Sequence, residues 1–121
     1  MKTQEAFASQ NQAAAWAGEL YANGVDKMDA VKFASVFTDD AWLRFGNAEP
    51  VIGRHTIETA IAGFFSMING LSHETTGTWY NDDALILEAN VTYDKKDGSR
   101  VSVPAVTIMR LSRSSDDSAE P

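Results

Sequence analysis

Residues 84–93, ALILEANVTY, alternate between two kinds of side chain and constrain the fold more than any other stretch. Successive strand residues point to opposite faces of a sheet. One face is wholly apolar and consists of Leu85, Leu87, Ala89, Val91 and Tyr93. The other face carries polar groups such as Glu88 and Asn90. The pattern therefore predicts a strand whose odd-numbered face lies against a hydrophobic core.

Two further extended segments flank this strand and predict an antiparallel meander. Residues 71–80 form the first, and "NDD" supplies the turn that follows it. The segment "DKKDG" predicts a hairpin, with Gly98 available for a positive φ. Residues 100–111 then form the last strand, in which Pro104 indicates a bulge or an unpaired side. Its apolar face consists of Val101, Val103, Ala105, Thr107, Met109 and Leu111.

The first half of the chain predicts three helices around one strand. Thr3 is expected to cap a helix that begins at Gln4 and ends at Asn23-Gly24. Asp26 is expected to cap a second, shorter helix that runs to Phe37, and a third runs from His55 to Ile68. Residues 41–46 alternate as a strand, and "NAEPVIG" after it is expected to be a loop. Helices segregated from an antiparallel sheet make an α+β domain.

Length and charge limit the classes of function. The 121 residues predict one domain over residues 1–112, followed by a polar tail, residues 113–121, with the composition of a disordered end. The net charge of −7 argues against binding to nucleic acid or to an anionic membrane. The chain has no cysteine, and its first residues lack the apolar core of a signal peptide, so a cytoplasmic location is expected.

At this point the chain resembles a known family. The order of elements, together with "VFTDDAWLRFGN", "PVIGR", "TIETAIAGFF" and "YDKKDGSRVSVPAVTIMRL", is similar to the SnoaL-like branch of the NTF2-like superfamily. Relatives there include polyketide cyclases, limonene epoxide hydrolase, ketosteroid isomerase and scytalone dehydratase. The resemblance implies a cone of three helices on a curved antiparallel sheet. Relatives usually have a further last strand, where this chain has "SRSSDDSAEP".

The family's catalytic groups find few matches in this chain. The carboxylate base of the isomerases corresponds to Phe45. The tyrosine and asparagine of the epoxide hydrolases correspond to Leu43 and Phe45, and their arginine and aspartate to Ala89 and Val91. The isomerase acid that supports the oxyanion falls near Thr107, which can still donate a hydrogen bond.

Two side chains remain as candidates for acid–base chemistry. His73 is the only histidine in a predicted strand, and a histidine titrates near neutral pH; a hydrogen-bonded or surface histidine is the plainer interpretation. Tyr21 could donate into a cavity from the first helix, although a core tyrosine with its hydroxyl at the rim is commoner. The residues expected to line an apolar pocket are Trp16, Leu43, Phe45, Phe64, Leu87, Ala89, Val91, Thr107 and Met109. His55 and His73 show no metal-ligand spacing, so neither a metal nor a cofactor is expected.

Two classes of function remain open. One is an enzyme of the cyclase, isomerase or epoxide hydrolase type that acts on a small apolar molecule. The other is a non-catalytic small-molecule-binding or dimerisation module of the same fold. A homodimer is expected through the outer sheet face, where Trp42, Val106 and Ile108 are apolar, with strand exchange at the exposed edge as a variant.

Overall fold

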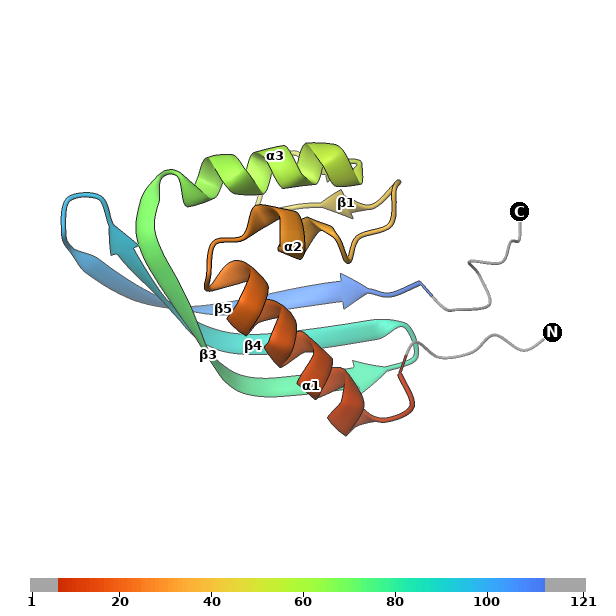
Figure 1. Ribbon diagram of the computed structural model, residues 1–121. Coiled ribbons are helices and arrows are strands. Elements are labelled where there is room, and N and C mark those ends of the chain that lie inside the picture. The colour runs from red at the N-terminus through yellow and green to blue at the C-terminus, as the bar shows by residue number, and fades with distance from the viewer. Residues whose placement is uncertain (1–6, 113–121) are drawn as a thin grey trace.

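A three-stranded antiparallel sheet forms the floor of the domain in the computed structural model, which describes residues 7–112. The strands are β3 (Ile68–Asn81), β4 (Ala84–Lys95) and β5 (Arg100–Arg110), in the order β3-β4-β5 (Figure 1). Three α-helices pack over one face of this sheet, as the sequence predicts for an α+β domain. The predicted cap Thr3 and the tail, residues 113–121, lie outside the described residues.

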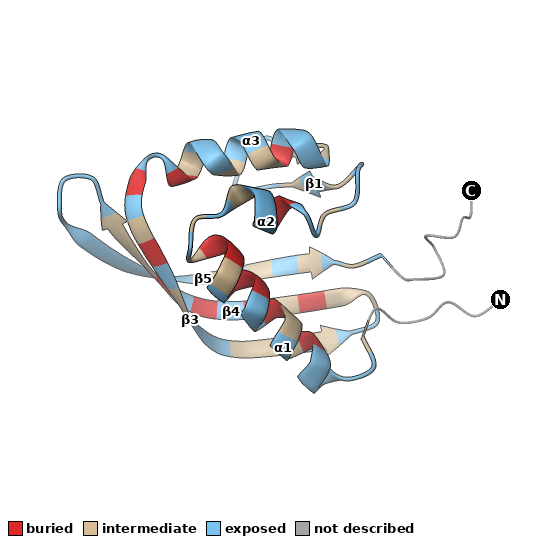
Figure 2. Cartoon of the chain, in the orientation of Figure 1, coloured by how far each residue is buried: buried red, intermediate tan, exposed pale blue. Residues whose placement is uncertain are grey.

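The central strand β4 has the predicted register. Leu85, Leu87 and Val91 are almost completely buried, whereas Glu88 and Asn90 are exposed. Figure 2 shows buried segments in both β3 and β4. Because Leu87 lies opposite Thr107 in the ladder, the inner face of β5 carries odd-numbered residues too.

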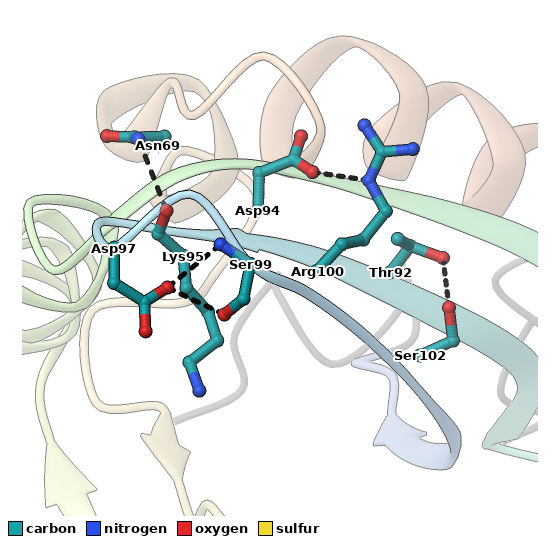
Figure 3. Close-up of polar contacts among 8 residues, drawn as sticks. All are labelled: Asn69, Thr92, Asp94, Lys95, Asp97, Ser99, Arg100 and Ser102. Atoms are coloured by element: carbon teal, nitrogen blue, oxygen red, sulfur yellow. Dashed lines mark hydrogen bonds and ion pairs between the residues drawn. The ribbon is translucent and has the colours of Figure 1, made fainter.

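The hairpin between β4 and β5 is held by short polar contacts (Figure 3). The Asp97 carboxylate accepts hydrogen bonds from the backbone N–H of Ser99, at 2.9 Å, and from its hydroxyl, at 2.6 Å. Gly98 has φ of 89°, the positive φ that the sequence predicts for this turn. Asp94 pairs with Arg100 at 2.7 Å on the strands just before and after the turn. These contacts fix the hairpin and with it the register of β5.

Two irregularities in β3 curve the sheet. The pairing with β4 shifts register between Ile68 and Gly70 and again between Thr75 and Gly77. A bulge bends its strand and increases the twist, so β3 curls around the helices, as Figure 1 shows. The prediction that the third helix runs to Ile68 is wrong, because that helix already ends at Phe65 and Ile68 pairs with Lys95.

The first helix, α1 (Gln10–Leu20), begins later than predicted. Ser9 is its N-cap, and the Ser9 hydroxyl accepts a hydrogen bond from the backbone N–H of Gln12 at 3.1 Å. The chain before it is tied to β3, because the Tyr80 hydroxyl accepts from the backbone N–H of Phe7 at 2.9 Å and donates to its carbonyl at 3.1 Å. A helix starting at Gln4 is therefore wrong, since residues 7–9 are non-helical.

A π-helix, η1 (Tyr21–Val25), continues α1 and leads to the short α2 (Ala30–Ala34). The predicted end at Asn23-Gly24 is wrong, because both residues lie inside the π-helix. Asp26 is not the cap of the second helix. That cap is Asp29, whose carboxylate accepts from the backbone N–H of Lys32 at 3.0 Å.

A small second sheet pairs β1 (Trp42–Leu43) with β2 (Val51–Ile52). The predicted strand at residues 41–46 is therefore shorter, because the chain turns at Gly46, where φ is 62°. The predicted loop "NAEPVIG" contains β2, which the sequence did not indicate. The helix α3 (Arg54–Phe65) follows, and its first residue Arg54 forms an ion pair with Asp39.

The two outer strands of the large sheet differ in how their edges are covered. The side-chain amide of Gln10 makes two hydrogen bonds to β3. Its nitrogen donates to the Thr78 carbonyl, and its oxygen accepts from the backbone N–H of Tyr80 at 2.9 Å. The Asp26 carboxylate accepts from the backbone N–H of His73 at 3.0 Å. Within residues 7–112, no strand pairs with the far edge of β5. Side chains therefore protect the edge of β3, while the edge of β5 is open.

We predict that Leu85→Ala lowers the free energy of unfolding by about 2–5 kcal/mol, because the truncation leaves a cavity in the wholly buried face of β4. Urea denaturation measures this. Val31→Ala on α2 is the matched control, since Val31 is exposed and its truncation should change stability by about 0.5 kcal/mol or less. Equal losses in the two variants would contradict the assignment of the core.

Candidate functional site

The π-helix η1 brings two polar side chains to the same side of the chain. The backbone N–H of Asp26 donates to the carbonyl of Tyr21 at 2.8 Å, a hydrogen bond across five residues. In an α-helix, residues five apart are separated by about 140° around the axis. The wider π-turn instead places residue 26 over residue 21. Both Tyr21 and Asp26 therefore face the inner side of the sheet.

Asp26 holds His73 of β3 at two points. One carboxylate oxygen accepts from the backbone N–H of His73 at 3.0 Å, and the other lies 2.7 Å from ring nitrogen Nδ1. The side chains are largely withdrawn from water, with 11% of His73 and 21% of Asp26 exposed. Because an ionised carboxylate only accepts, Nδ1 carries the hydrogen, and Nε2 of a neutral ring is left as an acceptor. Among the described residues Nε2 has no hydrogen-bond partner.

Tyr21 lies against the same histidine and reaches across the sheet. Its ring meets the His73 ring edge-on, with centroids 4.7 Å apart. The hydroxyl donates to Oγ1 of Thr107 on β5 over 3.4 Å, a long hydrogen bond. Burial raises the pKa of Tyr21 above its usual 10.0; the Thr107 hydrogen bond opposes this rise, and the nearby Asp26 carboxylate adds to it. Tyr21 is therefore a protonated donor at neutral pH.

The structure thus brings together three residues that the sequence singled out separately: His73, Tyr21 and Thr107. It adds Asp26, which the sequence suggested only as a helix cap. The segment "DKMD" offers two candidate caps, and the structure shows that Asp29 caps α2 and leaves Asp26 for another role. An aspartate that orients a histidine beside a tyrosine is an arrangement suited to proton transfer.

Several of the residues predicted to line a pocket lie on the inner side of the domain. Leu87, Ala89 and Val91 are buried in the core, and Val91 lies opposite His73 in the ladder. Phe64 lies further towards the hairpin, where its ring meets those of Phe45 and Tyr93 at 5.8 Å and 6.0 Å.

Three other predicted lining residues occupy different positions. Phe45 follows β1 rather than belonging to it, and it is 62% exposed, so its place on the inner face of a strand is wrong. Trp16 packs against Phe7, with ring centroids 5.3 Å apart, and Leu43 is half-buried in β1. A ligand-binding role for the predicted residues stays a prediction.

A hollow of about 310 Å³ lies on the outer side of the small sheet, lined by Trp42, Arg44, Pro50 and Ile52. None of the predicted lining residues borders it. No cluster of three or more histidine and acidic side chains that could hold a metal ion occurs within residues 7–112. No helix in that same range is long and apolar enough to cross a membrane.

Comparisons with known proteins agree with this fold. A sequence profile of the SnoaL-like domain matches residues 17–116. Among solved structures, a candidate SnoaL-like polyketide cyclase from Jannaschia sp. CCS1 superposes with a TM-score of 0.75 at 18% identity, covering 90% of this chain and 83% of that one. An epoxide hydrolase from M. tuberculosis that is similar to limonene epoxide hydrolase superposes with a TM-score of 0.68 at 14% identity, covering 83% of this chain and 74% of that one.

A third solved structure has the same fold. It is a hypothetical protein from Catenulispora acidiphila with a ketosteroid isomerase-like fold, determined in complex with trimethylamine. It gives a TM-score of 0.68 at 19% identity and covers 86% of this chain and 78% of that one. Identities this low establish the shared fold alone. No curated protein sequence matches the chain significantly.

The raised pKa of Tyr21 predicts a loss of stability in alkali. Above pH 10.0 an unfolded Tyr21 releases its proton while the folded one keeps it, so the folded state binds more protons. The free energy of unfolding therefore falls as pH rises from about 10 to the folded pKa. Urea denaturation at several pH values should show this slope, and Tyr21→Phe should reduce it.

Tyr93→Phe is the comparison for this measurement, because burial also raises the pKa of Tyr93. Tyr93 is less buried, so its removal should reduce the slope by less than Tyr21→Phe does. An unchanged slope in Tyr21→Phe would show that this hydroxyl is not withdrawn from water.

Proposed function

This chain belongs to the SnoaL-like domain family, whose profile spans most of its length, and we propose that it is an acid–base enzyme acting on a small, neutral, apolar carbonyl compound. The fold is one whose members include cyclases and epoxide hydrolases. The observation that carries the proposal is the 2.7 Å contact between Asp26 and His73 Nδ1, next to the buried Tyr21. It supplies a base and a hydrogen-bond donor in one place without a cofactor.

The reaction is proton removal from a carbon next to a carbonyl group. His73 Nε2 takes the proton, and the electron pair of the C–H bond moves into a carbon–carbon double bond as negative charge gathers on the carbonyl oxygen. Tyr21 donates a hydrogen bond to that oxygen in place of its long hydrogen bond to Thr107, which it can do because its pKa is raised and the hydroxyl stays protonated. Asp26 stabilises the imidazolium that forms on His73. Returning the proton to another carbon isomerises the substrate. If the carbanion instead attacks a second carbonyl, a carbon–carbon bond closes the ring, the C=O π pair moves onto the oxygen, and that alkoxide takes the proton back from His73.

The surroundings favour an uncharged substrate. Leu87, Ala89 and Val91 form an apolar surface beside the proposed catalytic groups, and the Asp26 carboxylate contacts His73 directly. An anionic molecule would be repelled by that carboxylate and would lose its hydration without a compensating cation.

Proton exchange tests this function without knowledge of the natural substrate. We expect the protein to speed the exchange of the α-protons of 2-tetralone in deuterium oxide, followed by proton NMR. His73→Ala should lower the catalysed rate by about 100-fold or more, the scale of lost general base catalysis. Tyr21→Phe and Asp26→Asn should lower it as well. His55→Ala is the matched control, because His55 is the exposed histidine at the start of α3 and should leave the rate unchanged.

The proposal fails if 2-tetralone exchanges at the buffer rate and a β,γ-unsaturated ketone is not converted. Saturable binding of these compounds without turnover would favour the alternative, a non-catalytic binding module. Equal loss of rate in His55→Ala and His73→Ala would remove His73 from the mechanism.

We also propose that the chain forms a homodimer through the outer face of the large sheet. Trp79, Ile86 and Ile108 lie in one row across the three strands, with Val106 beside them. Trp79, Val106 and Ile108 are each at least half exposed, and such contiguous apolar patches commonly mark interfaces. Trp42, which the sequence analysis placed on this surface, belongs instead to the small sheet.

Light scattering during size exclusion tests the dimer, for which we expect twice the 13.2 kDa chain mass. Ile108→Glu should shift the mass towards that of the monomer, because the change buries a charge in the interface. Val31→Glu, at an exposed site on α2, should not. A monomeric wild-type protein at micromolar concentration contradicts the proposal.

A further inference from the structure

The outer side of the small sheet carries an exposed apolar surface that the proposed function does not use. Trp42 on β1 pairs with Ile52 on β2, so both side chains stand on the same face. They are 62% and 67% exposed, which is high for side chains of this size. With Pro50 and Arg44 they line a hollow of about 310 Å³.

Arg44 differs from the other arginines of the described chain. Arg54 pairs with Asp39, Arg100 with Asp94 and Arg110 with Asp83. Arg44 has neither an ion pair nor a hydrogen bond with any residue from 7 to 112. In a chain with a net charge of −7, acidic partners are abundant, so this guanidinium is unusual in having none. It is available to bind an anion from solution.

The lining suits binding rather than catalysis. It contains no acidic side chain, histidine or hydroxyl group, and three of its four residues are apolar. A volume of about 310 Å³ is at the small end of the range for small-molecule sites, roughly 300–1,000 Å³, and it fits one or two fused rings. An indole face beside a guanidinium matches a planar ring that carries a carboxylate.

We propose that this hollow binds a small aromatic carboxylate, with the ring against Trp42 and Ile52 and the carboxylate on Arg44. The site is distinct from that of His73, because the ladder turns Trp42 and Ile52 away from the face that carries Leu43 and Val51. It also has the opposite charge preference, since Asp26 dominates the inner site and Arg44 the outer one.

An NMR titration of the full chain with 2-naphthoate tests the site. Saturable shifts are expected at the indole N–H of Trp42 and the guanidinium of Arg44, with a dissociation constant of about a millimolar or below. The neutral analogue 2-naphthalenemethanol should bind more weakly, because it cannot pair with Arg44. Added salt should weaken the binding of 2-naphthoate, since it screens an exposed ion pair.

Arg44→Gln should lower the affinity for 2-naphthoate about fivefold, the scale of an exposed charge pair. Arg100→Gln is the matched control, because Arg100 is similarly exposed but lies on the hairpin, and it should leave the affinity unchanged. Both variants should exchange the protons of 2-tetralone as the wild type does, which separates this site from the proposed enzyme activity.

Three results would overturn the proposal. In the first, the naphthoate shifts appear at Tyr21 and His73 instead of Trp42. In the second, Arg44→Gln binds 2-naphthoate as tightly as the wild type. In the third, the Trp42 signal changes with protein concentration alone, which would mean that a second copy of the chain occupies the hollow.

Discussion

Burial of one face of β4 determines the rest of the arrangement. Leu85, Leu87 and Val91 have almost no contact with water, and a shift of one residue would put Glu88 and Asn90 in their place. Because β3 and β5 both pair with β4, their inward-facing residues follow from its register. His73 faces the helices because it lies opposite Val91, and Thr107 does so because it lies opposite Leu87. The placement of His73 and Thr107 on the inner face of the sheet is therefore a consequence of the packing of the core.

The π-helix η1 at the end of α1 places Tyr21 and Asp26 beside the sheet. A regular α-helix through Tyr21 and Asp26 would direct the two side chains apart, whereas the π-turn aligns them. The carboxylate that results is partly buried, which costs free energy. Its two hydrogen bonds to His73 offset that cost. A departure from regular structure next to the proposed site is common at functional positions.

Long periodic segments were predictable from the sequence, and short or irregular ones were not. The alternation through residues 84–93 identified the buried face, and Gly98 identified the hairpin. The strand β2 could not be predicted, because it has only two residues and so shows no alternation of polar and apolar side chains. His73 and Tyr21 could be proposed from their chemistry alone.

The role of Asp26 could not be read from the sequence in the same way. It depends on a π-turn, for which residue propensities give no signal, and on β3, a strand 47 positions along the chain from it. The choice between a helix cap and a histidine partner was decided by tertiary structure.

The Asp26 carboxylate has two roles: it protects the edge of β3, and it orients the histidine of the proposed site. One oxygen of Asp26 satisfies a backbone N–H on the edge of β3, where an unpaired group would invite another strand. The other oxygen fixes the tautomer of His73. An asparagine could accept from the backbone N–H with its single oxygen, but its NH2 would then face Nδ1 and favour the opposite tautomer of the ring. Closure of the β3 edge and orientation of the histidine therefore depend on one side chain, that of the residue which ends the π-helix.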